Sequence, residues 1–257
     1  KTNPKIMIFS ILIAHYNNYD YFTECYNSIL NQTYQNFEIV IVDDCSTDNT
    51  MNIIRHFARE NKELEITILQ NETTLRTIKN FEKAISLCKY DWVFLCDQDD
   101  IWKKNKIEVM LRFIENNNDT LMLFTNASLI DENDQLLEGT IWDKWNFTKE
   151  NQNDWKNNDF AFQNLVRNKN YVTGATAVIS NKLFSKALPI IVPPRYYHDC
   201  WFALFASAHN GLYFIPDLLT EYRIHPKQQI GDAAAGKNIK NVLIDTGITQ
   251  EEFTTKM

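Results

Sequence analysis

The chain has 257 residues and a formal net charge of −7. This length suits one large domain with a substantial core, and the acidic balance argues against a nucleic-acid groove as the main function. Only six glycines are present, which excludes a Gly-rich phosphate loop, so the phosphates of any substrate would be met mostly by metal.

The N-terminal half alternates short apolar runs with helical patterns, a rhythm that is typical of βαβ units. Right-handed crossovers between such units give an α/β fold with an open, mostly parallel sheet flanked by helices. We predict strands at Phe9–Ala14, Phe37–Val42, Ile66–Leu69, Trp92–Cys96 and Leu121–Thr125, with helices near 20–31, 48–60, 75–88 and 103–116 between them.

From 138 to 170 the pattern is irregular and rich in Trp, Asn and Lys. A segment this long predicts a functional insertion or a surface-packed loop with short helices. Regular patterns then return, and a helical tail or appendage is predicted over 233–257. The later predicted strands are Tyr171–Ile179, Leu212–Ile215 and Leu219–Ile224, with helices near 181–187 and 199–209.

Cysteine usage and hydropathy bear on the cell compartment. The five cysteines form no C-x-x-C pair, which predicts reduced thiols and a cytoplasmic location. No run approaches the roughly 18 apolar residues of a membrane span, and no signal-peptide pattern is present. The chain begins with Lys1 rather than Met, which fits a piece of a longer protein and leaves a lost membrane anchor or second domain open.

Two of the predicted strands end in acidic residues. Asp43-Asp44 follows Phe37–Val42, and Asp97-Gln98-Asp99-Asp100 follows Trp92–Cys96. Ligands of parallel sheets collect beyond the carboxyl ends of the strands. Clustered carboxylates repel one another unless a cation or a set of donors neutralises them, and oxygen ligands favour Mg²⁺ or Mn²⁺ over zinc. A solvated acidic turn that caps the next helix is the alternative.

Three runs, in this order and in these strand contexts, resemble glycosyltransferase family 2. They are residues 10–17, residues 31–50 and residues 96–102. The likeness continues through 172–176, 197–201 and 221–225, so it covers roughly residues 8 to 230, and it is most similar to the rhamnosyltransferase-like branch. It implies a glycosyltransferase A-type fold with a catalytic domain over 1–232, divided into a nucleotide-binding half of about 1–126 and an acceptor half of about 127–232.

The resemblance also implies roles for residues near the donor. Tyr16 would lie against the base, with a core aromatic residue at the strand end as the alternative. Asp44 would bond the N3 position of a pyrimidine base, which favours UDP- or dTDP-linked donors. Arg76 and Lys79 are predicted base or diphosphate contacts, with a solvated helix face as the alternative.

Further implied roles concern the metal and the diphosphate. Asp97 would approach ribose and metal, and Asp99 would hold Mn²⁺ or Mg²⁺ against the diphosphate. His225 would reach back to the metal or be a structural histidine, and Arg223 could grip phosphate with two hydrogen bonds. Asp100 would orient the donor sugar or cap the following helix.

The acceptor side is predicted from the later motifs. An inverting transfer needs one base to take the proton of the attacking hydroxyl, and Asp199 matches the family's catalytic aspartate, with helix capping as the alternative. Gly174, His198 and Trp201 are predicted at the acceptor site. His198 would orient or pack rather than act as the base, and Trp201 is either a sugar platform or a core residue.

We therefore expect an inverting, metal-dependent transfer of one sugar to a hydroxyl of a glycan, lipid-linked or protein-linked acceptor, at the inner face of the membrane or in the cytoplasm. Peripheral membrane association, a homo-oligomer and fusion to another transferase domain are compatible with the sequence. Two alternatives are a catalytically silent carbohydrate-binding module on the same fold and a haloacid-dehalogenase-type phosphatase. The phosphatase would carry its D-x-D on the first strand, whereas here the motif follows the fourth.

Overall fold

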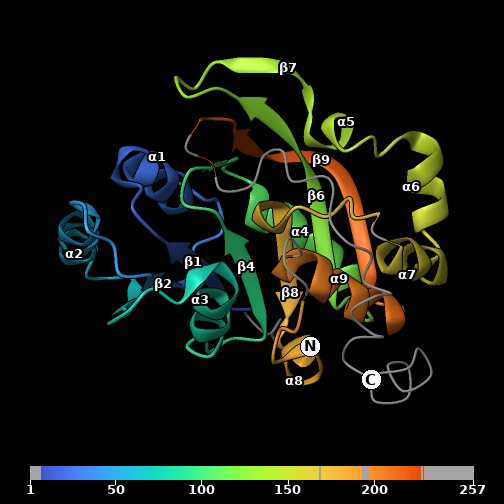
Figure 1. Ribbon diagram of the computed structural model, residues 1–257, viewed down its shortest axis with the longest axis horizontal. Coiled ribbons are helices and arrows are strands. Elements are labelled where there is room, and N and C mark those ends of the chain that lie inside the picture. Colours follow the sequence, from blue (N-terminus) through green and yellow to red (C-terminus); the bar gives the residue numbers. More distant parts are fainter. Residues whose placement is uncertain (1–6, 168, 193–196, 227, 229–257) are drawn as a thin grey trace, which may run out of the picture.

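The computed structural model describes residues 7–167, 169–192, 197–226 and residue 228. One sheet with helices on both sides makes up the molecule, and its strand order is β3-β2-β1-β4-β8-β6-β9-β5, with β7 beside β6 (Figure 1). The strands are β1 (Phe9–His15), β2 (Phe37–Asp43), β3 (Glu65–Gln70), β4 (Trp92–Cys96), β5 (Ile101–Trp102), β6 (Met122–Ile130), β7 (Leu136–Thr140), β8 (Ala177–Ser180) and β9 (Leu212–Arg223). The helices are α1 (Tyr19–Leu30), α2 (Thr50–Glu60), α3 (Arg76–Ile85), α4 (Lys106–Asn116), α5 (Ile141–Lys144), α6 (Lys149–Trp155), α7 (Asn158–Val166), the 3-10 turn η1 (Gly174–Thr176), α8 (Asn181–Ala187) and α9 (His198–Ala208).

The N-terminal half is a parallel sheet, as the sequence predicted. β1 pairs in parallel with both β2 and β4, and β2 pairs in parallel with β3. Each face of β1 is covered, since Leu12 packs into one core while Ile11 and Ile13 pack into the other. A strand buried on both faces needs apolar side chains at successive positions. This explains why a continuous apolar run in the sequence predicted the strand.

Helices cover the two faces of this sheet. α1, α2 and α4 contribute to one core, while α3, α8 and α9 contribute to the other. On α1 the buried positions Phe22, Cys25 and Ile29 are three and four residues apart, so one stripe of the helix faces the sheet. Burying a large apolar side chain such as Ile29 stabilises the fold by about 1.5–3 kcal/mol.

The second half departs from the predicted strand pattern. β8 joins the halves by pairing antiparallel with β4 and β6, and β9 runs parallel to β6. The two strands predicted on either side of Pro216 are one strand, β9, because the β6–β9 register shifts near Pro216 and the ladder continues beyond it. The strand predicted from Tyr171 is wrong in its first part, where η1 precedes β8. The sequence also did not predict β5 or β7.

The insertion forms short capped helices, which confirms the expectation of helices in this segment. Thr140 and Asp143 make a capping box on α5, and the side chains of Thr148 and Asn157 cap α6 and α7. Three of its aromatic residues are buried, whereas Phe160 is exposed. Trp142, Phe147 and Trp155 pack around Phe124 of β6.

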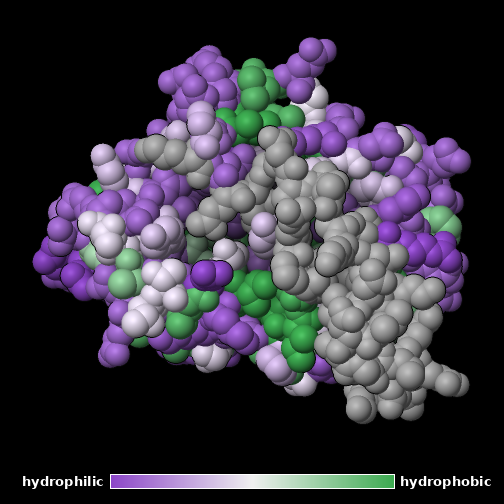
Figure 2. All heavy atoms as spheres, viewed as in Figure 1, coloured by the Kyte–Doolittle hydropathy of each residue, from purple (hydrophilic) through white to green (hydrophobic). Residues whose placement is uncertain are grey.

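The face seen in Figure 2 is mostly hydrophilic, with hydrophobic atoms near β7, where Leu136 and Leu137 are exposed, and in a larger area at the lower centre. All five cysteines are free thiols. Within the described ranges, no helix combines the length and the apolar character needed to span a bilayer. The helical tail predicted over 233–257 lies outside the described residues.

Candidate functional site

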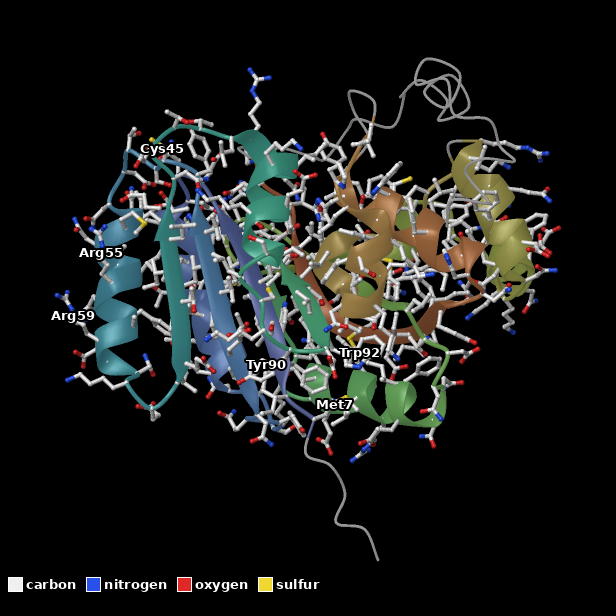
Figure 3. All side chains as sticks on the ribbon, turned by 90° about the horizontal axis from the view of Figure 1, so that it is seen from below. Met7, Cys45, Arg55, Arg59, Tyr90 and Trp92 are labelled. Atoms are coloured by element: carbon white, nitrogen blue, oxygen red, sulfur yellow. The ribbon has the colours of Figure 1, made fainter. Side chains whose placement is uncertain are left out.

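The parallel strands bring their acidic ends to the same edge of the sheet. His15 lies beside Asp43 in the β1–β2 register, and Ile13 lies beside Cys96 in the β1–β4 register. Cys45, which follows the β2 acidic pair, lies at the opposite end of the sheet from Tyr90 and Trp92 (Figure 3). The chain thus presents both acidic strand ends at one edge, as expected for a ligand site of a parallel sheet.

The turn after β4 is held from several sides. The backbone NH of Asp100 donates to the carbonyl of Asp97 over 3.4 Å. The side chain of Gln98 bonds the backbone of Tyr16 in both directions, at 2.8 and 3.1 Å. Thiols of Cys25 and Cys96 lie 3.5 and 3.4 Å from the Asp97 carbonyl oxygen. The acidic turn is therefore a fixed element of the fold.

Asp99 and His225, two predicted metal ligands, lie in direct contact. The Nε2 atom of His225 is 2.9 Å from Oδ2 of Asp99, and the histidine is 9% exposed. The ring of Tyr21 lies 5.0 Å from the imidazole, between ring centroids. Residues 126 positions apart are thus joined at the edge of the sheet.

Asp97 is partly buried next to these groups. Burial and the charges of Asp99 and Asp199 together raise its pKa to about 7, and the ammonium of Lys106 opposes this shift. The charge of Asp199 acts on Asp97, so the predicted base lies within electrostatic range of one predicted metal ligand. A cation bound here would offset this repulsion.

Asp100 is the last residue of the acidic turn, and it is buried, with 1% of its surface exposed. Its Oδ1 atom accepts a hydrogen bond of 2.9 Å from the backbone NH of Arg223, while its Oδ2 atom has no hydrogen-bond partner. Burial raises the pKa of this carboxyl, and Asp99 and Asp97 add to the shift. The side chain is buried inside the protein and bonds the backbone of Arg223. The geometry therefore does not favour its predicted contact with the donor sugar.

Arg223 is completely buried, which differs from the predicted grip on phosphate. Its Nε donates to the Asp99 carbonyl over 2.8 Å, and its Nη1 donates to the Asp131 carbonyl over 3.1 Å and also pairs with Asp134. Its Nη2 is 3.1 Å from a carboxylate oxygen of Glu24. The guanidinium therefore binds protein groups and connects the acidic turn to the β6–β7 hairpin and α1.

Asp199 lies in the first turn of α9 and is partly exposed. Its Oδ2 accepts a hydrogen bond from the Gly174 NH at 3.3 Å, and its Oδ1 accepts one from the Cys200 NH at 2.6 Å. Burial raises its pKa to about 6, against the lowering effect of these amides. A Cβ atom on Gly174 would lie 3.0 Å from Nε2 of His198, so glycine permits this close approach.

The other predicted acceptor residues are buried. His198 stacks on Phe81 with 3.7 Å between ring centroids, and neither ring nitrogen has a hydrogen-bond partner. Burial lowers its pKa to about 3, so the imidazole is neutral. Trp201 is 9% exposed, and its indole NH donates to the Ala187 carbonyl over 2.6 Å. The geometry therefore favours the core alternative for Trp201 over the sugar platform.

The predicted nucleotide contacts surround the end of β2. Asp44 is buried, with Oδ1 accepting from the Asn71 amide at 2.9 Å and the Leu75 NH at 2.6 Å, and Oδ2 accepting from the Arg76 NH at 2.8 Å. Tyr16 is 36% exposed. The exposed side chain of Lys79 pairs with Glu82 at 2.5 Å, so its predicted contact gains no support from the geometry.

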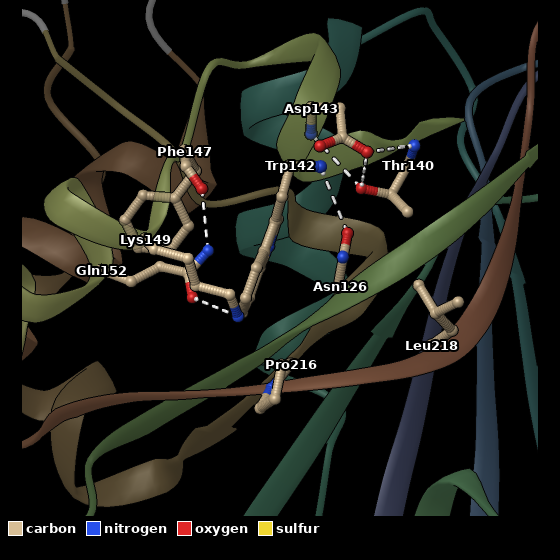
Figure 4. Close-up of a pocket in the computed structure, with 9 residues that line it drawn as sticks. All are labelled: Asn126, Thr140, Trp142, Asp143, Phe147, Lys149, Gln152, Pro216 and Leu218. Atoms are coloured by element: carbon tan, nitrogen blue, oxygen red, sulfur yellow. Dashed lines mark hydrogen bonds between the residues drawn. The ribbon is translucent and has the colours of Figure 1, made fainter. Parts of the chain in front are cut away.

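A shallow pocket of about 270 Å³ lies apart from this acidic edge, between β6, β9 and the insertion (Figure 4). Trp142 and Phe147 form part of its wall, with Asn126, Pro216 and Leu218 across from them. The side-chain Oδ1 atom of Asn126 accepts a hydrogen bond from the backbone NH of Trp142 at 3.2 Å, which holds the insertion against β6. The pocket lies in the half predicted to choose the acceptor.

The residues present fit a hard divalent cation that shares its ligands with a substrate. Asp97, Asp99 and His225 offer oxygen and imidazole donors, and few protein donors neutralise the carboxylates. Among the described residues, no group of three or more His, Cys, Asp or Glu side chains is already arranged to hold a metal ion. Mg²⁺ is commonly bound by one or two carboxylates plus substrate phosphates, which suits this arrangement.

Comparison with known sequences decides the family. The profile described as "Glycosyl transferase family 2" matches residues 10–180, more than half of the chain. The chain belongs to glycosyl transferase family 2. A relative from Bacillus subtilis, TuaG, is 31% identical over 144 residues, and its name assigns it provisionally as a glycosyltransferase of teichuronic acid biosynthesis. The alignment covers 56% of this chain and 54% of TuaG, so the chain spans about half the length of that relative.

Solved structures agree on the fold. S. aureus TarS (residues 1–349, in complex with UDP-GlcNAc) superposes with a TM-score of 0.63 at 21% identity, over 90% of this chain and 62% of the TarS chain. A mannosyltransferase from Pyrobaculum calidifontis, in complex with GDP-Man and Mn²⁺, gives 0.61 at 16% identity, over 88% and 60%. The fold is therefore that of the nucleotide-sugar transferases of the glycosyltransferase A type. The comparisons do not specify the rhamnosyltransferase-like branch.

Sequence reasoning missed several residues that shape this family 2 site. Lys106 is buried beneath the acidic turn, yet it follows Lys103 and Lys104 in a run that is typical of a solvated helix start. Glu24 and Asp134 hold Arg223, but neither belongs to a recognisable motif. These contacts join distant segments, and no local pattern in the sequence indicates them.

Proposed function

We propose that this chain transfers a single sugar from a UDP- or dTDP-linked donor to a hydroxyl of a glycan, lipid-linked or protein-linked acceptor, with inversion and with a divalent metal. Membership of the family supports the reaction class. The observation that carries the finer proposal is that the charge of Asp199 acts on Asp97 while Asp99 contacts His225. This supports a base and a cation site lying close together at the carboxyl edge of the sheet.

The metal, when bound, would stabilise by Lewis-acid attraction the negative charge that develops on the leaving diphosphate. Asp97 and Asp99 would hold it from the protein side, with His225 orienting Asp99. The Mn²⁺ bound in the Pyrobaculum mannosyltransferase complex supports this choice of ion. Arg223 supports the site indirectly, by fixing the backbone carbonyl of Asp99 at 2.8 Å.

Asp199 would act as the base. A carboxyl with a pKa of about 6 is ionised at neutral pH and is more basic than an ordinary aspartate. The two amides on Asp199 fix its orientation at the start of α9. A hydroxyl deprotonated here would attack the anomeric carbon on the face opposite the diphosphate, which inverts its configuration.

Asp44 and Tyr16 would select the donor's base. Oδ2 of Asp44 accepts one hydrogen bond from the protein and retains a lone pair for the N3 hydrogen of uracil or thymine. The exposed ring of Tyr16 would lie against the base. The complex of TarS with UDP-GlcNAc supports a uridine donor, and the name of TuaG supports a cell-surface glycan acceptor.

The test is a panel of UDP-, dTDP- and GDP-sugars assayed for nucleotide release with Mn²⁺. We expect Asp199→Asn to reduce the rate by about 10²–10⁴-fold, the usual contribution of a general base, while UDP affinity stays unchanged. Asp217→Asn, an exposed aspartate, is the matched control. Sugar binding without turnover in the native chain would favour the silent carbohydrate-binding alternative, and an unimpaired Asp199→Asn would remove Asp199 as the base.

A further inference from the structure

Lys106 is the first residue of α4 and is completely buried. A lysine is rarely buried unless its charge is paired or hydrogen-bonded. The neighbouring Lys104 is exposed, so burial is a property of this position and not of the lysine run. The side chain therefore needs an explanation beyond solubility.

The Lys106 ammonium donates two hydrogen bonds within the protein. Its Nζ atom is 2.8 Å from the Ala175 carbonyl oxygen and 2.8 Å from Oγ1 of Thr220. It also lies 4.0 Å from the centroid of the Trp102 ring, a cation–π distance. One side chain thus contacts η1, β9 and β5 at the same point.

Each of these elements carries part of the proposed catalytic apparatus. Ala175 follows Gly174, whose NH holds the Asp199 carboxylate. Thr220 lies in β9, which leads to Arg223 and then to His225. Trp102 lies two residues after Asp100, in the strand that ends the acidic turn. A displacement of any of the three would change the distance between the base and the metal ligands.

The charge of Lys106 also suits its position. Its field opposes the repulsion that raises the pKa of Asp97. Burial lowers the pKa of Lys106 itself to about 8, and Cys96, Asp100 and Asp97 oppose that shift. A neutral side chain of the same length would leave the carboxylates without this counter-charge.

We propose that Lys106 is a positioning residue, which ties η1, β9 and β5 together through its ammonium and so sets the spacing between Asp199 and the Asp97–Asp99 pair. It does not touch the donor or the acceptor. The expected effect of Lys106 on catalysis rests on the proposed function. The contact of Lys106 with the three elements can be tested without an activity assay.

The first measurement is amide hydrogen exchange on the whole chain. Lys106→Met keeps an unbranched side chain that is one atom shorter, and it removes the charge and the donors. We expect exchange to become about tenfold faster or more in peptides covering 173–177 and 219–223, because hydrogen bonds from charged donors are among the stronger ones, with β1 and β2 unchanged. Lys104→Met, on the exposed lysine, should exchange like the native chain throughout.

The second measurement separates positioning from general damage. In Lys106→Met we expect kcat to fall roughly 100-fold, the effect of a small misplacement of reacting groups, while affinity for UDP with Mn²⁺ stays within about threefold. The nucleotide contacts proposed at Tyr16 and Asp44 are untouched by this change. Uniformly faster exchange, unchanged exchange, or a kcat equal to that of Lys104→Met would each overturn the proposal.

A milder variant covers the case in which Lys106→Met does not fold. Thr220→Val removes one acceptor of the ammonium and preserves the shape of the buried side chain. The same two segments should exchange at least about threefold faster, and native exchange there would overturn the tie. In one outcome the native chain transfers no sugar from any donor while Lys106→Met still exchanges faster in residues 173–177 and 219–223. That result would contradict the proposed function but confirm that Lys106 holds the three elements together.

Discussion

The two acidic strand ends at the site differ in how many protein donors they receive. At the end of β2, Asp43 accepts hydrogen bonds from the Ser46 NH at 2.9 Å, from the Ser46 hydroxyl, and from the Gln70 amide at 3.3 Å. Its neighbour Asp44 accepts three more, from one side-chain amide and two backbone amides. The negative charge at this end is thus largely satisfied by the fold.

The end of β4 also carries aspartates, but these receive fewer hydrogen bonds from the protein. Asp99 contacts His225 alone among its described side-chain partners, and Asp100 retains an unpartnered buried oxygen. Burial and mutual repulsion raise the pKa values of Asp97 and Asp100, as expected for carboxylates without compensation. Lys106 and Arg223 lie beneath the turn, and Arg223 directs its side-chain donors to backbone carbonyls and to the carboxylates of Glu24 and Asp134.

The difference assigns different roles to two similar motifs. A carboxylate satisfied by backbone donors is a rigid acceptor, suited to reading one hydrogen on a base. Carboxylates held together without donors are suited to binding a cation that arrives with the substrate. The number of donors around each motif, more than the motif itself, distinguishes recognition from metal binding.

Asp99→Asn tests the β4 end and should have the largest effect. We expect turnover to fall by about 10³-fold, since metal stabilisation of a leaving group contributes several kcal/mol. The midpoint of thermal unfolding should not fall, because a source of repulsion has been removed. Turnover is measured over a Mn²⁺ titration, with the native chain in EDTA as the reference. Native-like turnover in the variant, or turnover that EDTA leaves intact, would contradict the cation role.

Asp43→Asn tests the β2 end. We expect the free energy of unfolding to drop by about 2 kcal/mol, because the new NH₂ group faces donors that previously bonded the carboxylate. Urea denaturation measures the change, with the exposed Asp217→Asn as control, which should stay within about 0.5 kcal/mol of the native chain. A loss as small as that of the control would mean that these hydrogen bonds do not stabilise the β2 end.

The strands of the nucleotide half could be predicted because their signal is local. β4 has the predicted bounds, and β1, β2 and β3 differ from the predictions by one residue at each end or less. Both faces of these strands are buried, so the apolar run and the strand coincide. Two other strands give weaker local signals: β9 of the acceptor half runs past Pro216, and β5 of the nucleotide half has only two residues.

Of the candidate site, the strand-end acids could be located from sequence, but their environments could not. The separation of Asp99 and His225 along the chain hides their contact, which only the family resemblance suggested. The burial of Arg223 and Lys106 depends on segments that meet only after folding. The sequence predicted a phosphate contact for Arg223 and indicated a solvated helix start at Lys106, so their contacts with the acidic turn could be found only from the tertiary structure.

The pH dependence of stability tests whether the carboxylates at the end of β4 lack hydrogen-bond donors. In the unfolded chain Asp97 loses its proton above about pH 4. In the folded chain its pKa is about 7, so it keeps the proton up to about pH 7. The folded state therefore binds more protons in this window, and stability falls as the pH rises through it. For the metal-free protein we expect a loss of about 1 kcal/mol between pH 5 and 7, after allowance for the partial exposure of Asp97.

Thermal unfolding of the native chain and of Asp97→Asn measures this effect. The variant lacks the titrating group, so its stability should fall less over the same window. Mn²⁺ with UDP should raise the stability of the native chain more at pH 7 than at pH 5, because the ionised carboxylate binds the cation. Parallel pH curves for the two proteins would show that Asp97 does not titrate as inferred.

The smallest effect concerns the backbone donor that Asp44 receives from Arg76. Arg76 has a φ of 67°, a left-handed conformation that costs a non-glycine residue about 1–2 kcal/mol. Arg76→Gly keeps the NH that bonds Asp44 and relieves the strain, while it adds freedom to the unfolded chain. We expect a net gain of about 0.5 kcal/mol in the free energy of unfolding, measured by urea denaturation.

Arg76→Ala separates backbone from side chain, because it removes the guanidinium and retains most of the strain. If the guanidinium contacts the diphosphate, both variants should raise the donor KM equally, by about fivefold. If the position matters only through its backbone NH, neither variant should change KM and only Arg76→Gly should gain stability. An Arg76→Gly protein that is less stable than Arg76→Ala would show that the turn at the β2 end is not strained. The rigidity ascribed to Asp44 would then need a cause other than this backbone donor.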